Sequence, residues 1–94
     1  MPGITRIGDA LSGNGCWGDH NIDAGSQNVF VNGIPASRAG DVSTIHCCLA
    51  DCHTGKMSGS NTVFINGKSA QKVGDPVDCG STQAAGSQNV FIGG

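Results

Sequence analysis

The sequence GSQNVFVNG at residues 25–33 decides the fold, because it recurs as GSNTVFING at 59–67 and as GSQNVFIGG at 86–94. Similarity that returns along a chain is the signature of a repeat architecture, in which one supersecondary unit is used several times. A chain built from three such units is predicted to fold with pseudo-threefold symmetry.

The repeat continues beyond this phrase with a basic residue, any small or apolar residue, Gly and Asp. RAGD at 38–41 follows the first copy, and KVGD at 72–75 follows the second. The third copy ends the chain, and its missing continuation, RIGD at 6–9, stands near the N-terminus. The sequence therefore predicts a closed ring whose two chain ends lie close together inside one unit.

We expect one domain over residues 1–94. Its repeat units are expected at about 25–58, 59–85, and 86–94 completed by 1–24. Closure of the ring removes the need for the separate capping units that open repeat arrays require.

Each phrase alternates around a Phe, which is typical of a short, half-buried strand. Val29 and Val31 share one face of such a strand, and Phe30 takes the other. Asn-Gly follows in the first two copies, and this pair is favoured in type I′ hairpin turns. Return strands are predicted at 36–39 and 70–73, and no helical periodicity exceeds one turn. The predicted fold class is all-β, with three β-hairpin repeats.

The composition limits the size of the apolar core and the classes of molecule that the chain could bind. Leu, Ile, Val and Phe number nineteen in 94 residues, near the lower limit for a self-sufficient core. The net charge is −2 and Lys plus Arg total five, which argues against a basic stripe for nucleic acid. The first residues lack the design of a signal peptide, and no apolar run is long enough to span a bilayer. We expect synthesis in the cytoplasm.

All histidines and cysteines lie between a Gly-Asp and the next Gly-Ser, in loops 10–24, 42–58 and 76–85, and none lies in an expected strand. They are Cys16, His20, His46, Cys47, Cys48, Cys52, His53 and Cys79. Equivalent loops of a threefold ring emerge at the same end, so these ligands are expected to converge. Three imidazoles and one thiolate satisfy tetrahedral zinc, and iron can use similar ligands. The matching set is His20, His46, His53 and Cys79.

Two other uses of the cysteines stay open. Cys47, Cys48 and Cys52 would offer a site richer in thiolates, and disulfides could form after export. In a reducing cytosol, ligands or thiols are favoured over a disulfide framework.

Every unit also carries a basic residue three positions before an Asp. These residues are Arg6, Arg38 and Lys72, with Asp9, Asp41 and Asp75. They could form ion pairs, but exposed pairs contribute little to stability, so a solvated rim is the favoured interpretation. Trp17 is either an exposed contact residue or a cover for the thin core.

Two segments identify a family resemblance. PASRAGD at 35–41 and SAQKVGD at 69–75 resemble the motif that names the PAAR-repeat family, and the Gly-Ser phrases are similar to its scaffold. The resemblance covers essentially the whole chain. It implies a small cone-shaped β protein that caps the trimeric spike of contractile injection machines, meaning type VI secretion systems and contractile phage tails.

The resemblance also implies a metal, typically zinc held by three His and one Cys, in loops near the point of the cone. By position, His46 and His53 fit the second loop and Cys79 fits the third. The first loop departs from the pattern, because Asn14-Gly15-Cys16 stands where relatives often place His before Gly-Cys. His20 is the candidate that compensates, with Cys16 as its competitor for the fourth position.

The implied partner is a homotrimeric spike protein, VgrG-like or a phage central spike, with one chain per trimer. Effector proteins are further candidate partners, no nucleic acid is expected, and contact with the target membrane would be transient. The chain would be assembled at the tail tip and delivered through the target cell envelope, without enzymatic activity. The alternative is a small zinc-dependent hydrolase with an open metal site, in which Asp19, Asp51 or Asp78 would serve as general base.

Overall fold

The computed structural model describes residues 2–13, 19–48 and 51–92. Within these ranges the chain forms eight short strands and no helix, which confirms the all-β prediction. The strands are β1 (Ala10–Leu11), β2 (His20–Asn21), β3 (Phe30–Val31), β4 (Ile34–Pro35), β5 (His46–Cys48), β6 (Asp51–His53), β7 (Phe64–Ile65) and β8 (Lys68–Ser69). They pair as four antiparallel hairpins, β1–β2, β3–β4, β5–β6 and β7–β8.

The repeated phrases form three equivalent pairings. Phe30 pairs with Pro35 in one hairpin, and Phe64 pairs with Ser69 in another. In the third unit Phe91 pairs with Gly3, so two ends of the chain replace the hairpin turn. The Ile92 N–H donates to the Pro2 carbonyl at 3.1 Å beside this pair. The predicted proximity of the chain ends is confirmed.

The Asn-Gly pairs form the turns that the sequence predicted. Asn32 and Gly33 have φ values of 55° and 76°, and Asn66 and Gly67 have 54° and 77°. Positive φ at both central positions defines the type I′ turn, whose twist matches that of the strands it joins. The return strands were predicted at 36–39 and 70–73, however, and the observed strands β4 and β8 begin earlier, at Ile34 and Lys68. Because the turn has only two residues, the chain returns at once in β4 and β8.

Residues 36–39 and 70–73, predicted as return strands, link the units to one another instead. Arg6 pairs with Ala36, Arg38 pairs with Ala70, and Lys72 pairs with Ile4. The first two bridges lead from one unit to the next, and the third leads back to the start. This cycle of bridges confirms the prediction of three pseudo-threefold repeats.

The basic-x-Gly-Asp segment is a tight turn closed by its own side chains. The Asp41 N–H donates to the Arg38 carbonyl at 3.0 Å, and Gly40 has a φ of 90°, which identifies a type II turn. The Asp41 carboxylate accepts hydrogen bonds from the Arg38 backbone N–H at 2.8 Å and from its guanidinium at 3.0 Å. Arg6 with Asp9, and Lys72 with Asp75, repeat the arrangement.

These ion pairs do not form the solvated rim that the sequence favoured. The side chains of Arg38 and Asp41 are only 16% and 6% exposed. The hydrogen bond from Asp41, reinforced by its charge, raises the pKa of Arg38 above its ordinary value despite partial burial. The same turn that brings Asp back to the basic residue also folds both side chains against the ring, and sequence spacing alone did not reveal this burial.

The core is thin, as composition predicted, and consists of two small clusters. One joins the three units of the ring and contains Ile4, Val31, Ala36, Ile65, Ala70 and Ile92. The other contains Leu11, Ile22, Met57 and Val77, with Cys79 packed against it. Polar residues at equivalent positions of the three units, Thr5, Ser37 and Gln71, are also fully buried. Gln83 links two of them, since it accepts from Thr5 at 2.7 Å and donates to Gln71 at 2.9 Å.

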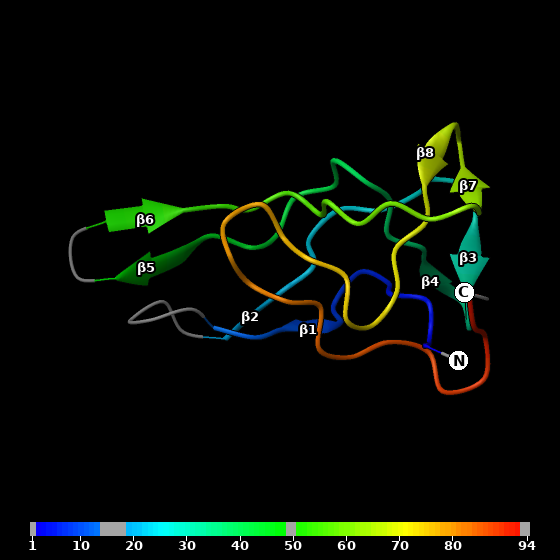
Figure 1. Ribbon diagram of the computed structural model, residues 1–94, viewed down its shortest axis with the longest axis horizontal. Coiled ribbons are helices and arrows are strands. Elements are labelled where there is room, and N and C mark those ends of the chain that lie inside the picture. Colours follow the sequence, from blue (N-terminus) through cyan, green and yellow to red (C-terminus); the bar gives the residue numbers. More distant parts are fainter. Residues whose placement is uncertain (1, 14–18, 49–50, 93–94) are drawn as a thin grey trace.

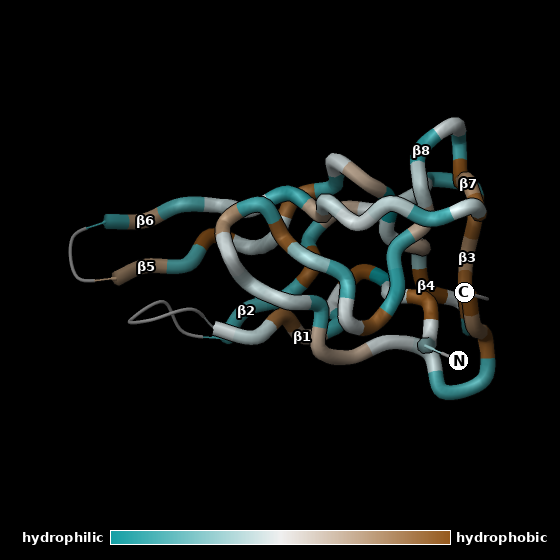
Figure 2. The backbone as a smooth tube through the Cα atoms, in the orientation of Figure 1, coloured by the Kyte–Doolittle hydropathy of each residue, from teal (hydrophilic) through white to brown (hydrophobic). Residues whose placement is uncertain are grey.

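The molecule is elongated, with principal extents of 37 × 25 × 21 Å. Hairpins β3–β4 and β7–β8 lie at one end together with both termini, while β5–β6 reaches towards the other end (Figure 1). We call the first end the base, and define it by these two hairpins and the Gly3–Phe91 pair. The backbone along β3 and β7 is distinctly hydrophobic (Figure 2). In the described part of the chain there is no helix that could cross a membrane.

Candidate metal centre

Three of the predicted ligands come together away from the base. His20 lies in β2 and His46 in β5, with 6% and 7% of each residue exposed, and the half-buried Cys79 follows Val77 in the third loop. Their ligand atoms all lie within 4.8 Å of one another. One residue from each of the loops 10–24, 42–58 and 76–85 therefore belongs to this group.

The prediction that no histidine or cysteine lies in a strand is wrong. His20 belongs to β2, and β5–β6 carries His46, Cys47, Cys48, Cys52 and His53. The first two loops each contain a short hairpin of their own. A hairpin gives its side chains a fixed register, so the ligands are held more firmly than on irregular loops.

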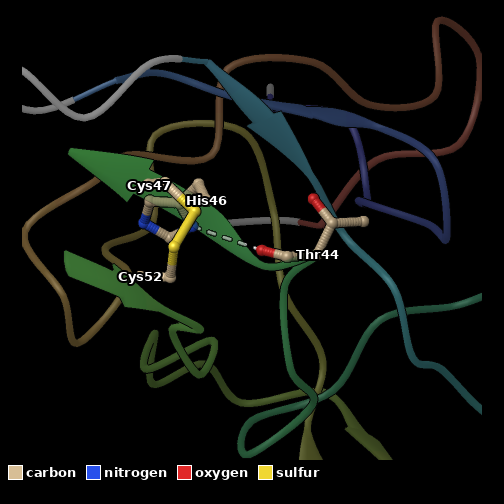
Figure 3. Close-up of a disulfide and its surroundings, with 4 residues drawn as sticks. All are labelled: Thr44, His46, Cys47 and Cys52. Carbon is tan, nitrogen blue, oxygen red and sulfur yellow. Dashed lines mark hydrogen bonds between the residues drawn. A yellow bond between two sulfur atoms is a disulfide. The ribbon is translucent and has the colours of Figure 1, made fainter. Parts of the chain in front are cut away.

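His46 occupies the middle of the cluster. Its ring stacks on that of His20 with centroids 3.7 Å apart. Its Nδ1 lies 3.2 Å from the Thr44 carbonyl oxygen, a contact drawn in Figure 3. Because a carbonyl only accepts, Nδ1 carries the proton, and Nε2 presents a lone pair. That Nε2 lies 3.8 Å from Cys79 Sγ.

The separation fits a tetrahedral metal site. Zinc bonds of 2.0–2.3 Å place neighbouring N and S ligand atoms roughly 3.3–3.6 Å apart. Only a small contraction would bring Nε2 of His46 and Sγ of Cys79 to this separation. The donor set of imidazole and thiolate, drawn from three segments of the chain, is the set that zinc prefers.

His53 lies beside this group of three. It is the cross-strand partner of His46, and the two rings meet edge to face with centroids 4.2 Å apart. His53 is half-buried and comes from β6, but it does not belong to the group whose ligand atoms lie within 4.8 Å of one another. Cys16, the competitor of His20 for the fourth position, and Trp17 lie outside the described residues.

Cys47 and Cys52 are joined by a disulfide, which corrects the expectation of ligands or thiols. They are directly opposite one another on β5 and β6, with Cα atoms 4.0 Å apart (Figure 3). Cys48 is disulfide-bonded as well. A disulfide sulfur cannot act as a thiolate ligand, so the thiolate-rich alternative is wrong for all three cysteines. The sequence showed a separation of five residues but not the strand register that makes the two cysteines face each other. Cys79 keeps its thiol.

Gly55 provides the space that Cys79 occupies. Its N–H donates to Ser43 Oγ at 2.9 Å and its carbonyl accepts from the Ser43 N–H at 2.8 Å, so the backbone is fixed. A Cβ at this position would lie 2.7 Å from Cys79 Sγ and 2.6 Å from Val77 Cγ1. Sequence reasoning did not single out Gly55, because nothing in its neighbourhood marks a close approach.

Replacing Gly55 by Ala is expected to displace Cys79 and to lower zinc affinity about tenfold or more, with an overpacking cost of about 1–3 kcal/mol in stability. Competition with a chromophoric chelator measures the affinity, and thermal unfolding measures the stability. Thr54→Ala is the matched control, since Thr54 is exposed and adjacent. Equal zinc affinity in both variants would show that Cys79 does not need this space to bind metal.

The comparisons with known proteins agree with this geometry. A family model, the PAAR motif, matches residues 20–85. The matched segment begins at His20 and contains His46, His53 and Cys79, together with both complete hairpin repeats. No curated protein matches the chain. Because the model covers well over half of the sequence, the chain belongs to the PAAR-motif family.

Proposed function

We propose that this chain is a structural tip protein, which binds and sharpens the end of the trimeric membrane-puncturing spike of a contractile injection machine. Membership of the PAAR family supports a role at the spike tip. The single observation that carries the proposal is a threefold set of exposed apolar side chains at the base.

Each unit exposes a Val-Phe pair from the repeated phrase. Phe30, Phe64 and Phe91 are 55%, 65% and 47% exposed, and the preceding valines, Val29, Val63 and Val90, are also exposed. The residue that follows each Phe is buried, namely Val31, Ile65 and Ile92. The predicted alternation around Phe is confirmed for these residues, whereas Val29 does not share the burial of Val31. Exposed apolar groups repeated in this way mark an interaction surface.

The symmetry of this surface favours a trimeric partner. A homotrimer ends in three equivalent surfaces related by a threefold axis. One chain with three similar units can present a Val-Phe pair to each subunit, which gives one chain per trimer. Capping would also cover strand edges at the trimer end that otherwise invite aggregation.

A metal ion would stiffen the part of the chain away from the base. His20, His46 and Cys79, completed by His53, would hold zinc as a structural ion, with iron as a second candidate. The ion would cross-link the three segments that also supply the small cluster of Leu11, Ile22, Met57 and Val77. The PAAR family is a structural one, so we propose no catalytic role for Asp19, Asp51 or Asp78.

The proposal is tested by mixing the purified chain with a trimeric spike protein from the same organism and measuring mass by size exclusion with light scattering. A complex of one chain with three spike subunits is expected. The Ile45→Ser variant is expected to form the same complex, because Ile45 is exposed but lies outside the base. A chain that elutes as a monomer in the presence of the spike would contradict the proposal.

A further inference from the structure

Two cross-strand pairs lie next to each other on the β5–β6 hairpin. His46 faces His53, and at the adjacent register position Cys47 faces Cys52. Neighbouring residues of a strand point to opposite faces. His46 is accordingly buried against the candidate ligands, whereas Cys47 and Cys52 are exposed. The disulfide is thus one residue from each of two predicted ligands without competing for the metal.

The hairpin that carries these ligands is small, and Cys48 of β5 is disulfide-bonded as well. Each of its strands has three residues, and it forms a sheet of two strands alone. An isolated two-stranded hairpin is marginally stable in water. Backbone bridges attach the hairpin to the rest of the chain before β5 and after β6, where Ser43 pairs with Ile22 and Lys56 pairs with Val42. Within β5, His46 also contacts His20 and Cys79.

We propose that the Cys47–Cys52 disulfide is a positioning element for the metal site, and that it makes metal affinity depend on the redox state of the chain. With the bond intact, His46 and His53 are held in cross-strand register before metal binds. With the bond cleaved, the strands can separate, and metal binding must restore the register. This inference rests on the proposed metal-binding role of His46 and His53.

The remaining ligands are unaffected by this redox step. Cys79 keeps its thiol in the structure and His20 belongs to another hairpin, so both are present in either state. A phosphine reductant cleaves the S–S bond together with one water molecule. The phosphorus is oxidised to the phosphine oxide by taking the oxygen, and the two hydrogens go to the two sulfur atoms.

The test compares zinc affinity in three samples by competition with a chromophoric chelator: the oxidised chain, the chain treated with a phosphine, and the oxidised Cys47→Ser/Cys52→Ser variant. The oxidised chain is expected to bind zinc about tenfold or more tightly than the other two, in keeping with the entropy of closing a short loop. Phosphine should weaken binding by the variant less than binding by the natural chain, because the variant lacks this bond.

A second measurement distinguishes positioning of the metal ligands from a general stabilisation of the fold by the disulfide. Thermal unfolding of the metal-free chain reports stability, which any disulfide would raise. Zinc affinity of the folded chain reports how well His46 and His53 are positioned. Phosphine also reduces the disulfide of Cys48. Should the double variant fail to fold, the oxidised single variant Cys52→Ser therefore takes its place in the comparison. Equal zinc affinity in both redox states would overturn this inference and leave the metal site standing. Absence of zinc binding in the oxidised chain would overturn both.

Discussion

Replacing His46 by Ala is expected to abolish stoichiometric zinc binding. His46 is the residue that contacts all of the other candidates, since its ring packs on His20 and His53 and its Nε2 faces Cys79 Sγ. Loss of a ligand should exceed the 10–100-fold effect typical of residues that only support ligands, so affinity is expected to fall by at least about 100-fold. Elemental analysis of the purified protein measures the metal content per chain.

The other three alanine variants show how many ligands the chain supplies. His20→Ala and Cys79→Ala are expected to behave like His46→Ala, because the three residues form the tightest group. His53→Ala also loses zinc if the site is closed by four protein ligands. Zinc retained by His53→Ala alone would indicate an open position, the arrangement that a hydrolase would need. Stoichiometric metal in all four variants would contradict the ligand set.

The ring could be predicted because its determinants are local. Asn32-Gly33 and Gly40-Asp41 each specify a turn through backbone conformations that few residues adopt. Matching the RIGD segment at 6–9 with its two copies then indicated where the chain closes. The burial of the Arg38–Asp41 pair was missed, because it depends on residues distant in sequence: Arg38 also donates to Asn66 of the next unit and to the Gly25 carbonyl of its own unit.

The site could be predicted only as a cluster. Grouping by loop correctly brought His20, His46 and Cys79 together, since threefold symmetry places equivalent loops at one end. The disulfide and the strand placement could not be predicted, because both depend on the register of β5 and β6. No Asn-Gly or similar pair marks a turn between Cys48 and Asp51, so the sequence does not reveal that Cys47 faces Cys52.

Replacing the three exposed phenylalanines is expected to abolish binding to the trimeric spike. Burial of one Phe contributes about 1.5–3 kcal/mol, so the variant Phe30→Ser/Phe64→Ser/Phe91→Ser should lose at least about 1000-fold in affinity. The fold should persist, because these side chains are exposed while Val31, Ile65 and Ile92 form the core. Binding to the immobilised spike measures the loss, and unchanged zinc content shows that the rest of the chain is intact.

The single variants test whether each of the three units contacts one subunit of the spike. If each unit meets one subunit, Phe30→Ser, Phe64→Ser and Phe91→Ser should each weaken binding by roughly tenfold or more, and their free energies should add, because separated sites act independently. Ile45→Ser removes an equally exposed apolar side chain outside the base and should leave affinity unchanged. A large effect from only one phenylalanine would mean that a single unit makes the contact. Comparable, additive effects from all three require a partner that presents the same surface three times.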